Sequence, residues 1–581
     1  MPNLLAMSFE GSLSPSFDLR CLRRGGALPD GWGLGFYPEG EQSASVLKEP
    51  APPVGGTRSS LVKTWDRIHS PIVVLHMRAA RWGAVSDANT QPFSRSWGRR
   101  DWMFVHAGSL VERLELGEDS LFEPVGSTDT EVIFCEILAK LAQKKCRSLH
   151  ELDVAVLHDW FEELNALGVL TCGITDGQDL VMHADGNGDQ PLWVCEIVPP
   201  YDQVILGDDD VQLDLTLHGA KARRAVILST HPLRAESAID LRWRQLEPGS
   251  TLVLRQGLIV AELARDRRRF VQHDGPRRIH TSVPQRPSEA YARMLEIKHR
   301  TSYRYEKTIE RSTHLFRLEP IHDRVQRVTA YQLDISVEGR RIEYDDVFGN
   351  RAVRVLIDKP FSELTIESRA TVLTTDTDPL QFRPMHARTT IPLNWMPWQR
   401  HMLQPYLLPP ELPESQLVEL HEYAMTFVER NGYDLVDTLL DMNQSIFRDY
   451  AYKQGVTTLH TTPFEIYTDR KGVCQDFTNL LICLARLLGI PARYVCGYLW
   501  TGPKHHNRVM AEATHAWTQV YLPEVGWKGF DPTNGILTQT EHIRVAVGRN
   551  YIDATPTSGT IYAGGGGVET LEVSVTVEET S

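Results

Sequence analysis

The chain has 581 residues, of which 42% are hydrophobic and 23% charged, and its formal net charge at pH 7 is −14. This composition is that of an ordinary globular protein, and the length suggests about three or four domains. The negative charge argues against a general nucleic-acid binder, because affinity for phosphate needs a basic face. Without an apolar run of about 18 residues or an export signal, we expect a cytoplasmic protein with no membrane partner.

The cysteines argue against a metal site. The chain contains 8 of them, scattered without the paired spacing that holds zinc. In a chain of this length, such scatter fits reduced thiols better than a disulfide framework. We therefore expect no metal and no cofactor. The residues are Cys21, Cys135, Cys146, Cys172, Cys195, Cys474, Cys483 and Cys496.

Residues 1–264 alternate between strand-like and helix-like patterns, which is typical of an α/β domain. The strand-like segments are 71–77, 102–105, 168–174 and 225–229, and the helix-like segment is 129–143.

Six short segments of this region occur in a distinctive order. They are Leu4-Leu5-Ala6-Met7-Ser8, His76-Met77-Arg78-Ala79, Asn89-Thr90-Gln91-Pro92-Phe93, Phe104-Val105-His106-Ala107-Gly108, Gly126-Ser127-Thr128-Asp129-Thr130-Glu131 and Ser229-Thr230-His231-Pro232-Leu233. In these segments the chain resembles the class II glutamine amidotransferase domain. The resemblance implies an N-terminal-nucleophile fold of the αββα sandwich type, with two sheets between helix layers.

The chemistry of that family does not carry over to this chain. The family's nucleophile is a cysteine directly after the initiator methionine, with its own α-amino group as the base, but Pro2 stands at that position. The family's oxyanion-hole asparagine corresponds to Ala107, which has no side-chain donor. Arg78 and Asp129 match the residues that hold the carboxylate and amino group of glutamine. We expect an inactive domain in which they either bind an amino acid, a γ-glutamyl group or a peptide end, or only support the fold.

Three segments follow before the next helical region. Residues 265–290 are rich in arginine and proline without an apolar period, which indicates a linker. Residues 291–375 contain several alternating strand-like segments and predict a small β-sandwich. Residues 376–413 are rich in proline and aromatic residues, and we interpret them as an extended connector that lies against the next domain.

Residues 414–581 contain the segment that is most informative about chemistry. Between 471 and 488, apolar residues recur every three or four positions, which predicts a helix with one buried face. Cys474 lies in its first turn, where free N–H groups and the helix dipole stabilise a thiolate. Cys474 is therefore the candidate nucleophile. The alternative is a cysteine used as a small core hydrophobe.

A histidine and an aspartate downstream complete the candidate site. Residues 515–522 and 527–532 read as two antiparallel strands that fold about Pro523, which brings His515 near Asp531. The turn is not centred between them, so a bulge beside the site would be needed to adjust the register. A thiolate, an imidazole and a carboxylate that orients the imidazole form the Cys-His-Asp version of the nucleophilic triad.

Several motifs around these residues support the assignment. They are Gly472-Val473-Cys474-Gln475-Asp476-Phe477, Gly489-Ile490-Pro491-Ala492-Arg493, His515-Ala516-Trp517 and Gly526-Trp527, leading to Asp531-Pro532-Thr533. Here the chain resembles the transglutaminase-like superfamily, whose core is papain-like, and the β-rich segment resembles the N-terminal domain of its bacterial branch. The resemblance implies an α+β multidomain protein in which residues 414–581 form the catalytic core together with a C-terminal strand. It makes Cys474 the nucleophile, His515 the general base and acid, and Asp531 its orienter.

Further roles follow from the same resemblance. The Cys474 backbone N–H is expected to be the first oxyanion donor, with Gln454 as a candidate for the second. Trp517 either walls the cleft and contacts substrate or packs below it. The expected reaction is acyl transfer from an amide of a peptide or protein substrate: resolution by water gives a peptidase or amidase, and resolution by an amine gives a transglutaminase.

Two alternatives to this reading stay open. The first is a non-catalytic scaffold, in which both large domains bind a peptide partner. The second is live glutamine amidotransfer, which would require a nucleophile at position 2.

Overall fold

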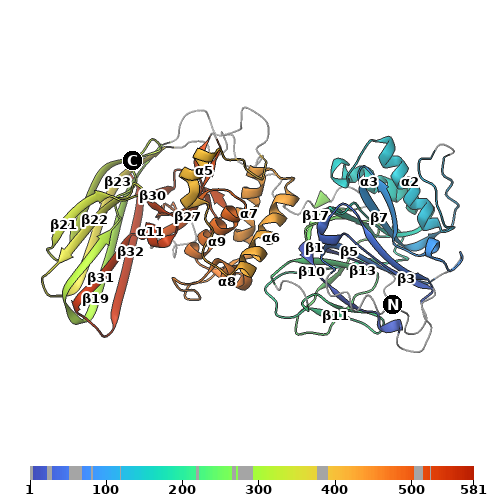
Figure 1. Ribbon diagram of the computed structural model, residues 1–581, viewed down its shortest axis with the longest axis horizontal. Helices are drawn as coiled ribbons and strands as arrows, with labels where there is room; N and C mark the ends of the chain where they lie inside the picture. Colours follow the sequence, from blue (N-terminus) through green and yellow to red (C-terminus); the bar gives the residue numbers. More distant parts are fainter. Residues whose placement is uncertain are drawn as a thin grey trace. The chain divides into compact units, whose positions relative to one another are not determined.

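The computed structural model describes residues 4–22, 29–50, 68–79, 83–117, 120–217, 222–264, 270–271, 292–375, 390–502, 514–523 and 525–580. Pro2 and almost all of the linker at 265–290 lie outside these residues. The chain divides into two compact units, Met1–Arg278 and Ile279–Ser581 (Figure 1). Among the helices in the described ranges, none combines the length and apolar character needed to cross a membrane.

The first unit is built on two seven-stranded antiparallel sheets. In sheet order, the first contains β15 (Trp243–Gln245), β10 (Trp193–Ile197), β13 (Ala225–Ser229), β1 (Leu4–Leu13), β5 (Ser70–Arg78), β3 (Gly31–Phe36) and β4 (Ser45–Pro50). The second contains β18 (Phe270–Val271), β17 (Leu258–Leu263), β16 (Thr251–Arg255), β9 (Asp179–His183), β8 (Gly168–Thr175), β7 (Arg100–Leu110) and β6 (Phe93–Trp97).

The two sheets pack face to face, because their strands are apolar on both sides. One buried cluster contains Leu4 and Val74 from the first sheet with Val105 and Leu180 from the second. Helices α2 (Asp129–Gln143) and α3 (Val154–Asn165) cover the other face of the second sheet (Figure 1).

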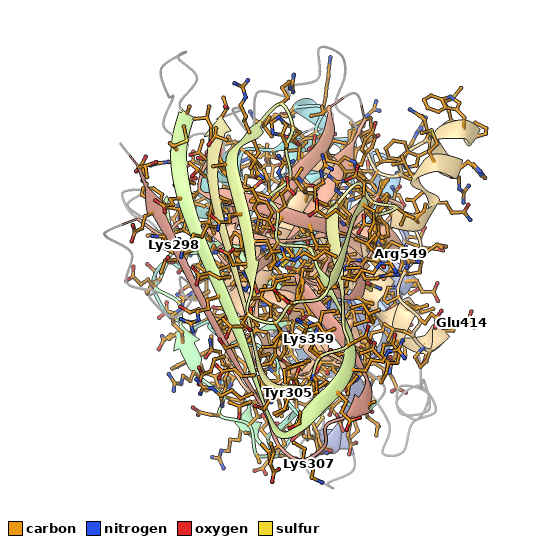
Figure 2. The ribbon with its side chains drawn as sticks, turned by 90° about the vertical axis from the view of Figure 1, so that its left-hand side faces the viewer. Lys298, Tyr305, Lys307, Lys359, Glu414 and Arg549 are labelled. Carbon is orange, nitrogen blue, oxygen red and sulfur yellow. The ribbon has the colours of Figure 1, made fainter. Side chains whose placement is uncertain are left out.

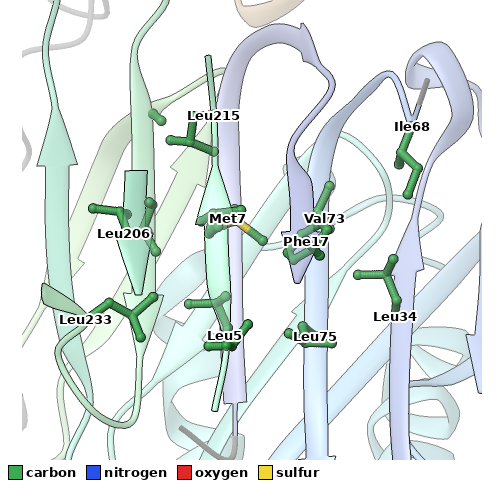
Figure 3. Packing of buried hydrophobic residues seen from close by; sticks show 14 of the residues in the cluster. Leu5, Met7, Phe17, Leu34, Ile68, Val73, Leu75, Leu206, Leu215 and Leu233 are labelled. Carbon is green, nitrogen blue, oxygen red and sulfur yellow. The ribbon is translucent and has the colours of Figure 1, made fainter. Parts of the chain in front are cut away.

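The other face of the first sheet is covered differently. A four-stranded sheet of β14 (Arg234–Ala235), β11 (Ile205–Gly207), β12 (Gln212–Asp214) and β2 (Ser16–Asp18) packs there. Figure 3 shows Met7 and Val73 of the large sheet in a shared cluster with Phe17 and Leu206 of the small one. Within the described residues, this strand layer stands where the sequence led us to expect helices.

Short helices punctuate the loops of both units. The single-turn 3-10 helices are η1 (Arg20–Leu22), η2 (Pro38–Gly40), η3 (Asp87–Asn89), η4 (Leu149–Glu151) and η6 (Gln404–Tyr406).

The second unit begins with a sheet organised around one long strand. The order is β20 (Gln326–Ile335), β23 (Phe361–Thr375), β19 (Ala292–Phe316), β22 (Arg351–Ile357) and β21 (Arg340–Asp345). The register of β19 breaks between Arg304 and Ile309, and Figure 2 shows the strand turning near Tyr305 and Lys307.

Because β19 bends, its two halves belong to two layers of strands. Its first half pairs with β23 and its second half with β22, and Val355 of β22 shares a buried cluster with Leu364 of β23. The C-terminal strands β31 (Thr557–Gly564) and β32 (Glu569–Glu579) also pair with β19. They complete this sheet, whereas the sequence analysis grouped them with the catalytic core.

The remaining elements surround a five-stranded sheet. In sheet order, its strands are β29 (Ile536–Leu537), β28 (Gly526–Asp531), β27 (His515–Leu522), β26 (Ala492–Leu499) and β30 (His542–Gly548). The helices are α5 (Pro397–Leu403), α6 (Glu414–Arg430), α7 (Leu435–Asp449), α8 (Pro463–Asp469), α9 (Cys474–Leu487) and α11 (Tyr551–Ala554). Helix α9 packs against β26 and β27, which places its first turn beside the start of β27.

The described part of the connector lies against this sheet. The Trp395 ring contacts Tyr521 at 5.9 Å between centroids, and Tyr406 contacts Trp527 at 5.1 Å. The Trp395 indole N–H also donates to the carbonyl of Gly489 at 3.1 Å. These contacts are at the end of the sheet where the last residues of β27 lie, away from His515.

Candidate active site

The start of α9 is fixed by a side-chain cap. The Asp476 carboxylate accepts the N–H of Val473 at 2.8 Å and the Thr457 hydroxyl at 2.7 Å, which satisfies a donor that the first helical turn leaves without a partner. Burial raises the pKa of Asp476. The apolar face of α9, including Leu480 and Leu484, is fully buried, so the helix is anchored along its length.

This anchoring holds Cys474 at the first position of α9. Its thiol is half-buried, whereas Cys483 and Cys496 are buried, and all eight cysteines are free thiols. Because Cys474 is the first helical residue, its N–H has no acceptor within the helix and is available to another group. Thiol and N–H are thus both presented at the end of a helix dipole that favours negative charge.

His515 and Asp531 meet at the ends of β27 and β28. The paired residues run from Thr518 opposite Phe530 to Leu522 opposite Gly526 without a register shift. Continued by one pair, this register puts Asp531 opposite Trp517, so His515 lies diagonally across on the same strand face. The His515 Nε2 to Asp531 Oδ2 distance is 2.8 Å, and the bulge considered from the sequence is absent from these pairs.

The imidazole of His515 connects the thiol to the carboxylate. Its ring is hydrogen bonded to Asp531, and its interaction with the Cys474 side chain helps to raise the pKa of the imidazole. Because Nε2 is held by Asp531, Nδ1 is the ring atom left to face the thiol. The relative exposure of His515 is 3% and that of Asp531 is 0%, so only the sulfur end of this chain of contacts opens to solvent.

Charge interactions dominate the ionisation of this pair. Burial lowers the pKa of His515, but the charge and hydrogen bond of Asp531, together with Cys474, raise it to about 10. Burial likewise raises the pKa of Asp531, but the charge and hydrogen bond of His515, helped by His542, hold it well below its usual range. The structure therefore favours an imidazolium next to a carboxylate at neutral pH.

Asp531 is held from several sides. Its Oδ1 accepts the backbone N–H groups of Thr533 at 3.0 Å and Asn534 at 3.2 Å. Its Oδ2 accepts the Asn534 side-chain amide at 2.7 Å and Nε2 of His542 at 3.2 Å, in addition to His515. The sequence analysis did not anticipate His542. Its position at the start of an apolar strand was the only signal, and its partner depends on how β30 pairs in the sheet.

Among the described residues, one group of side chains has the composition and spacing of a metal site, and it consists of the residues that make these contacts. Ligand-type atoms of His515, Asp531 and His542 all lie within 4.8 Å of one another. Each imidazole points its Nε2 at the same carboxylate oxygen, at hydrogen-bonding distance. The atoms are thus already paired as donors and acceptor.

The structure places Trp517 and Gln454 on different sides of this site. Trp517 is fully buried below it, with its ring 5.9 Å from that of His515. Tyr452 pairs with Gly472 across the short parallel strands β24 (Ala451–Tyr452) and β25 (Lys471–Gly472). Gln454 lies in the turn that follows β24. Burial raises the pKa of Tyr452 and the side chain of Gln454 partly offsets this rise, which places Gln454 near Tyr452.

In the first unit, Arg78 and Asp129 both contact backbone. Arg78, at the end of β5, donates to the carbonyl of Ala84 at 3.1 Å. Asp129, at the start of α2, accepts the N–H of Leu110 at 2.8 Å. The Asn89 side chain joins the two regions, since it donates to the Ala84 carbonyl at 2.9 Å and accepts the N–H of Ser127 at 2.7 Å.

Comparison with known families agrees with this division of the chain. The family model for class II glutamine amidotransferases matches residues 1–276, the bacterial transglutaminase-like N-terminal region matches 295–373, and the transglutaminase-like superfamily matches 423–532. The N-terminal half of the chain belongs to the class II glutamine amidotransferase family, and the C-terminal half matches the two transglutaminase-like models. The chain joins an N-terminal amidotransferase domain to a transglutaminase-like region and core.

Several individual relatives cover a little under half of the chain. An uncharacterized protein of Mycobacterium tuberculosis is 34% identical over 283 residues, which are 46% of this chain and 87% of the relative. A protein of Escherichia coli K12, named as a candidate glutamine amidotransferase, is 30% identical over 255 residues, 43% of this chain and 91% of the relative. The crystal structure of a predicted glutamine amidotransferase from Pseudomonas aeruginosa is 26% identical, covers 45% of this chain and 99% of its own, and gives a TM-score of 0.37.

The amidotransferase domain retains its fold around an altered site. Ala107 is buried in β7, where its methyl group offers no hydrogen-bond donor. Its neighbour Gly108 has a φ of 148°, and a Cβ there would lie 2.1 Å from the carbonyl oxygen of Val169, so only glycine fits. The close contact between β7 and β8 at this position therefore requires glycine.

Proposed function

We propose that the transglutaminase-like core catalyses cysteine-dependent acyl transfer from amide bonds. The observation that carries this proposal is the chain of contacts from the half-exposed Cys474 through His515 to the buried Asp531. Membership of the transglutaminase-like superfamily supports an enzyme of this general kind. In this proposal Cys474 is the nucleophile, His515 the acid and base, and Asp531 the group that orients it.

The geometry supports a two-step reaction. The Cys474 thiolate attacks the amide carbonyl carbon, the C–N bond breaks, and the His515 imidazolium gives its proton to the leaving amine, so that a thioester remains. Water or a second amine then gives a proton to His515 and attacks the thioester carbon, and Cys474 leaves as a thiolate. The Cys474 N–H and the Gln454 side chain stabilise the oxyanion in both steps.

Water is the acceptor that we favour, which makes the enzyme a peptidase or amidase that acts on a peptide or protein. Transfer to an amine, the transglutaminase reaction, uses the same thioester. In finer detail, we infer a papain-like core, a β-sandwich ahead of it, and an N-terminal-nucleophile type of sandwich in the first unit.

The amidotransferase domain has a different role in this proposal. With Pro2 at the nucleophile position and Ala107 at the oxyanion position, it does not hydrolyse glutamine. Arg78 and Asp129 remain as a pair of opposite charges that fits an amino-acid or peptide end. The domain therefore serves as a binding module for the substrate of the core.

Mass spectrometry of peptide libraries, incubated with and without lysine-type amines, tests the proposed activity. We expect the wild-type protein to produce cleaved or cross-linked peptides and Cys474→Ala to produce neither. Cys483→Ala is the matched control, because Cys483 is a buried thiol on the same helix and its loss should leave the products unchanged. Products that survive in Cys474→Ala would contradict the proposal. Binding of peptides without any product would favour the non-catalytic scaffold instead.

A further inference from the structure

A second imidazole contacts the carboxylate of the proposed triad. His542, at the start of β30, directs Nε2 at the same Asp531 oxygen that holds His515. Its relative exposure is 5%, and its ring meets that of Trp517 edge to face at 5.2 Å and 77°. The ring is therefore held in place by packing as well as by its hydrogen bonds.

The tautomer of His542 follows from the hydrogen bond at its Nδ1. The backbone N–H of Gln539 donates to Nδ1 at 3.4 Å, and the His542 N–H donates back to the Gln539 carbonyl at 3.1 Å. Because Nδ1 accepts a hydrogen bond, the ring proton of the neutral imidazole is on Nε2. His542 is then a fixed donor to Asp531.

The orientation of Asp531 does not depend on His542 alone. The N–H groups of Thr533 and Asn534 hold Oδ1, and the Asn534 side chain holds Oδ2. What His542 adds is a further donor on the oxygen that faces His515. Donors that share one oxygen compete for its negative charge, and this matters most in a buried site of low dielectric.

We propose that His542 is a positioning residue that shares the charge of Asp531 and so limits how strongly this carboxylate holds the His515 imidazolium. The inference rests on the proposed function, in which His515 must release its proton to the leaving amine. A neighbour that withdraws charge from Asp531 makes the imidazolium a better acid for that step. The loss of His542 would leave the proton more tightly bound.

Titration of His515 by NMR tests this directly in Cys474→Ala protein, labelled at histidine. Among the described residues, the charged and titratable groups that face the ring are then Asp531 from β28 and His542 from β30, because the thiol of α9 has been removed. We expect His542→Phe, which keeps a ring against Trp517 but has no donor, to raise the titration midpoint of His515 by about half a pH unit or more. In His542→Gln, which keeps a donor, the titration midpoint of His515 should stay close to its value in the protein that retains His542.

Kinetics of the same His542 variants in protein that retains Cys474 give a second readout. His542→Phe should lower kcat about 3- to 10-fold with little change in KM, and should move the basic limb of kcat/KM to higher pH. In His542→Gln, kcat and the position of the basic limb should be close to those of the protein that retains His542. An unchanged or lowered His515 midpoint in His542→Phe would overturn the proposal, because a purely structural role would damage the site without raising that midpoint. Equal kinetic losses in His542→Phe and His542→Gln would also overturn it.

The wild-type protein supplies a test that does not depend on how the variants fold. Its ¹⁵N spectrum should show the neutral His542 ring with its proton on Nε2 and none on Nδ1, by the hydrogen-bond pattern given above. The opposite tautomer would overturn the inference. A raised His515 midpoint without any turnover would instead leave this inference standing and remove the proposed function.

Discussion

At the scale of single residues, the buried pair of His515 and Asp531 governs both chemistry and stability. The pair lies at 2.8 Å, with almost no exposure of either side chain. Removing one member of a buried ion pair is costly because the remaining charge loses its partner. The same change also removes the group that orients the imidazole.

Asp531→Asn therefore has two expected effects. It should lower kcat about 10²- to 10⁴-fold by analogy with other triads, while substrate still binds. It should also lower the free energy of unfolding by about 3–5 kcal/mol near pH 6. Asn534→Ala, which removes one donor to Asp531 but keeps the charge, is the milder comparison. Peptide hydrolysis and urea unfolding measure the two effects, and an Asp531→Asn enzyme of wild-type rate would contradict the assignment of Asp531.

The stability effect should depend on pH in a defined direction. The pKa of His515 is raised from 6.5 to about 10 in the folded chain, so its contribution is complete below about 6.5 and is lost as the pH rises through about 10. The pKa of Asp531 is depressed from 3.8, so its contribution is present above about 3.8 and is lost as the pH falls.

Urea unfolding of the wild-type protein and Asp531→Asn, compared from pH 4 to 10, measures this dependence. The difference between them should be largest at about pH 4–6.5 and should shrink toward pH 10. A difference that grows with pH in the alkaline range would contradict the ion pair.

At the scale of elements, the close packing of β26, β27 and β30 assembles the site. Gly497 of β26 pairs with His515 on one side, and on the other a Cβ at this position would lie 2.0 Å from the carbonyl oxygen of Ile543. The Trp517 ring would also be only 2.6 Å from that Cβ. Glycine is thus needed for the approach of β30, which carries His542.

Gly497→Ala should push β26 and β30 apart. We expect a loss of about 1–3 kcal/mol in the free energy of unfolding, as for other overpacked interiors, together with a loss of activity. Gly117→Ala is the control, because a Cβ at Gly117 would have no neighbour within 4 Å. Chemical denaturation compares the variants, and equal stability of both would show that the strand contact is not tight.

The elements around Cys474 could be predicted because their signals are local. The three- and four-residue period after Cys474 marks α9, and the alternation from His515 to Leu522 coincides with β27. His542 could not be predicted, since its contact with Asp531 depends on the pairing of β30 with β26 across the sheet. The small sheet on the first unit and the return of β31 and β32 to β19 depend in the same way on long-range pairing, which no periodicity encodes.

At the scale of the whole molecule, the first domain matches the amidotransferase family but differs from the expected catalytic residues at two positions. The amidotransferase family model covers residues 1–276, yet position 2 is proline and position 107 is alanine. In the proposed function, such a site lacks the nucleophile for thiol attack on glutamine.

We therefore expect the full-length protein to release no ammonia from glutamine, with or without Cys474→Ala. An enzyme-coupled ammonia assay measures this, and added ammonium chloride verifies the coupling. Ammonia release that persists in Cys474→Ala would revive glutamine amidotransfer as the function of the first domain.

The binding role of that domain has its own test. Calorimetry of the full-length Cys474→Ala protein with glutamine, glutamate and short peptides should give heat of binding that Arg78→Met abolishes, because the guanidinium pairs with a carboxylate. Absence of heat with every ligand would mean that Arg78 and Asp129 only support the fold through their contacts with Ala84 and Leu110.

The central claim is that His515 activates the thiol of Cys474, and the rate of alkylation of this one residue tests it most directly. Iodoacetamide labelling of Cys474, followed by peptide mass spectrometry between pH 5 and 8, compares the wild-type protein with His515→Gln. We predict that at pH 6 the wild-type thiol reacts at least about tenfold faster than the same thiol in His515→Gln. Equal rates in the two proteins across this range would contradict the account.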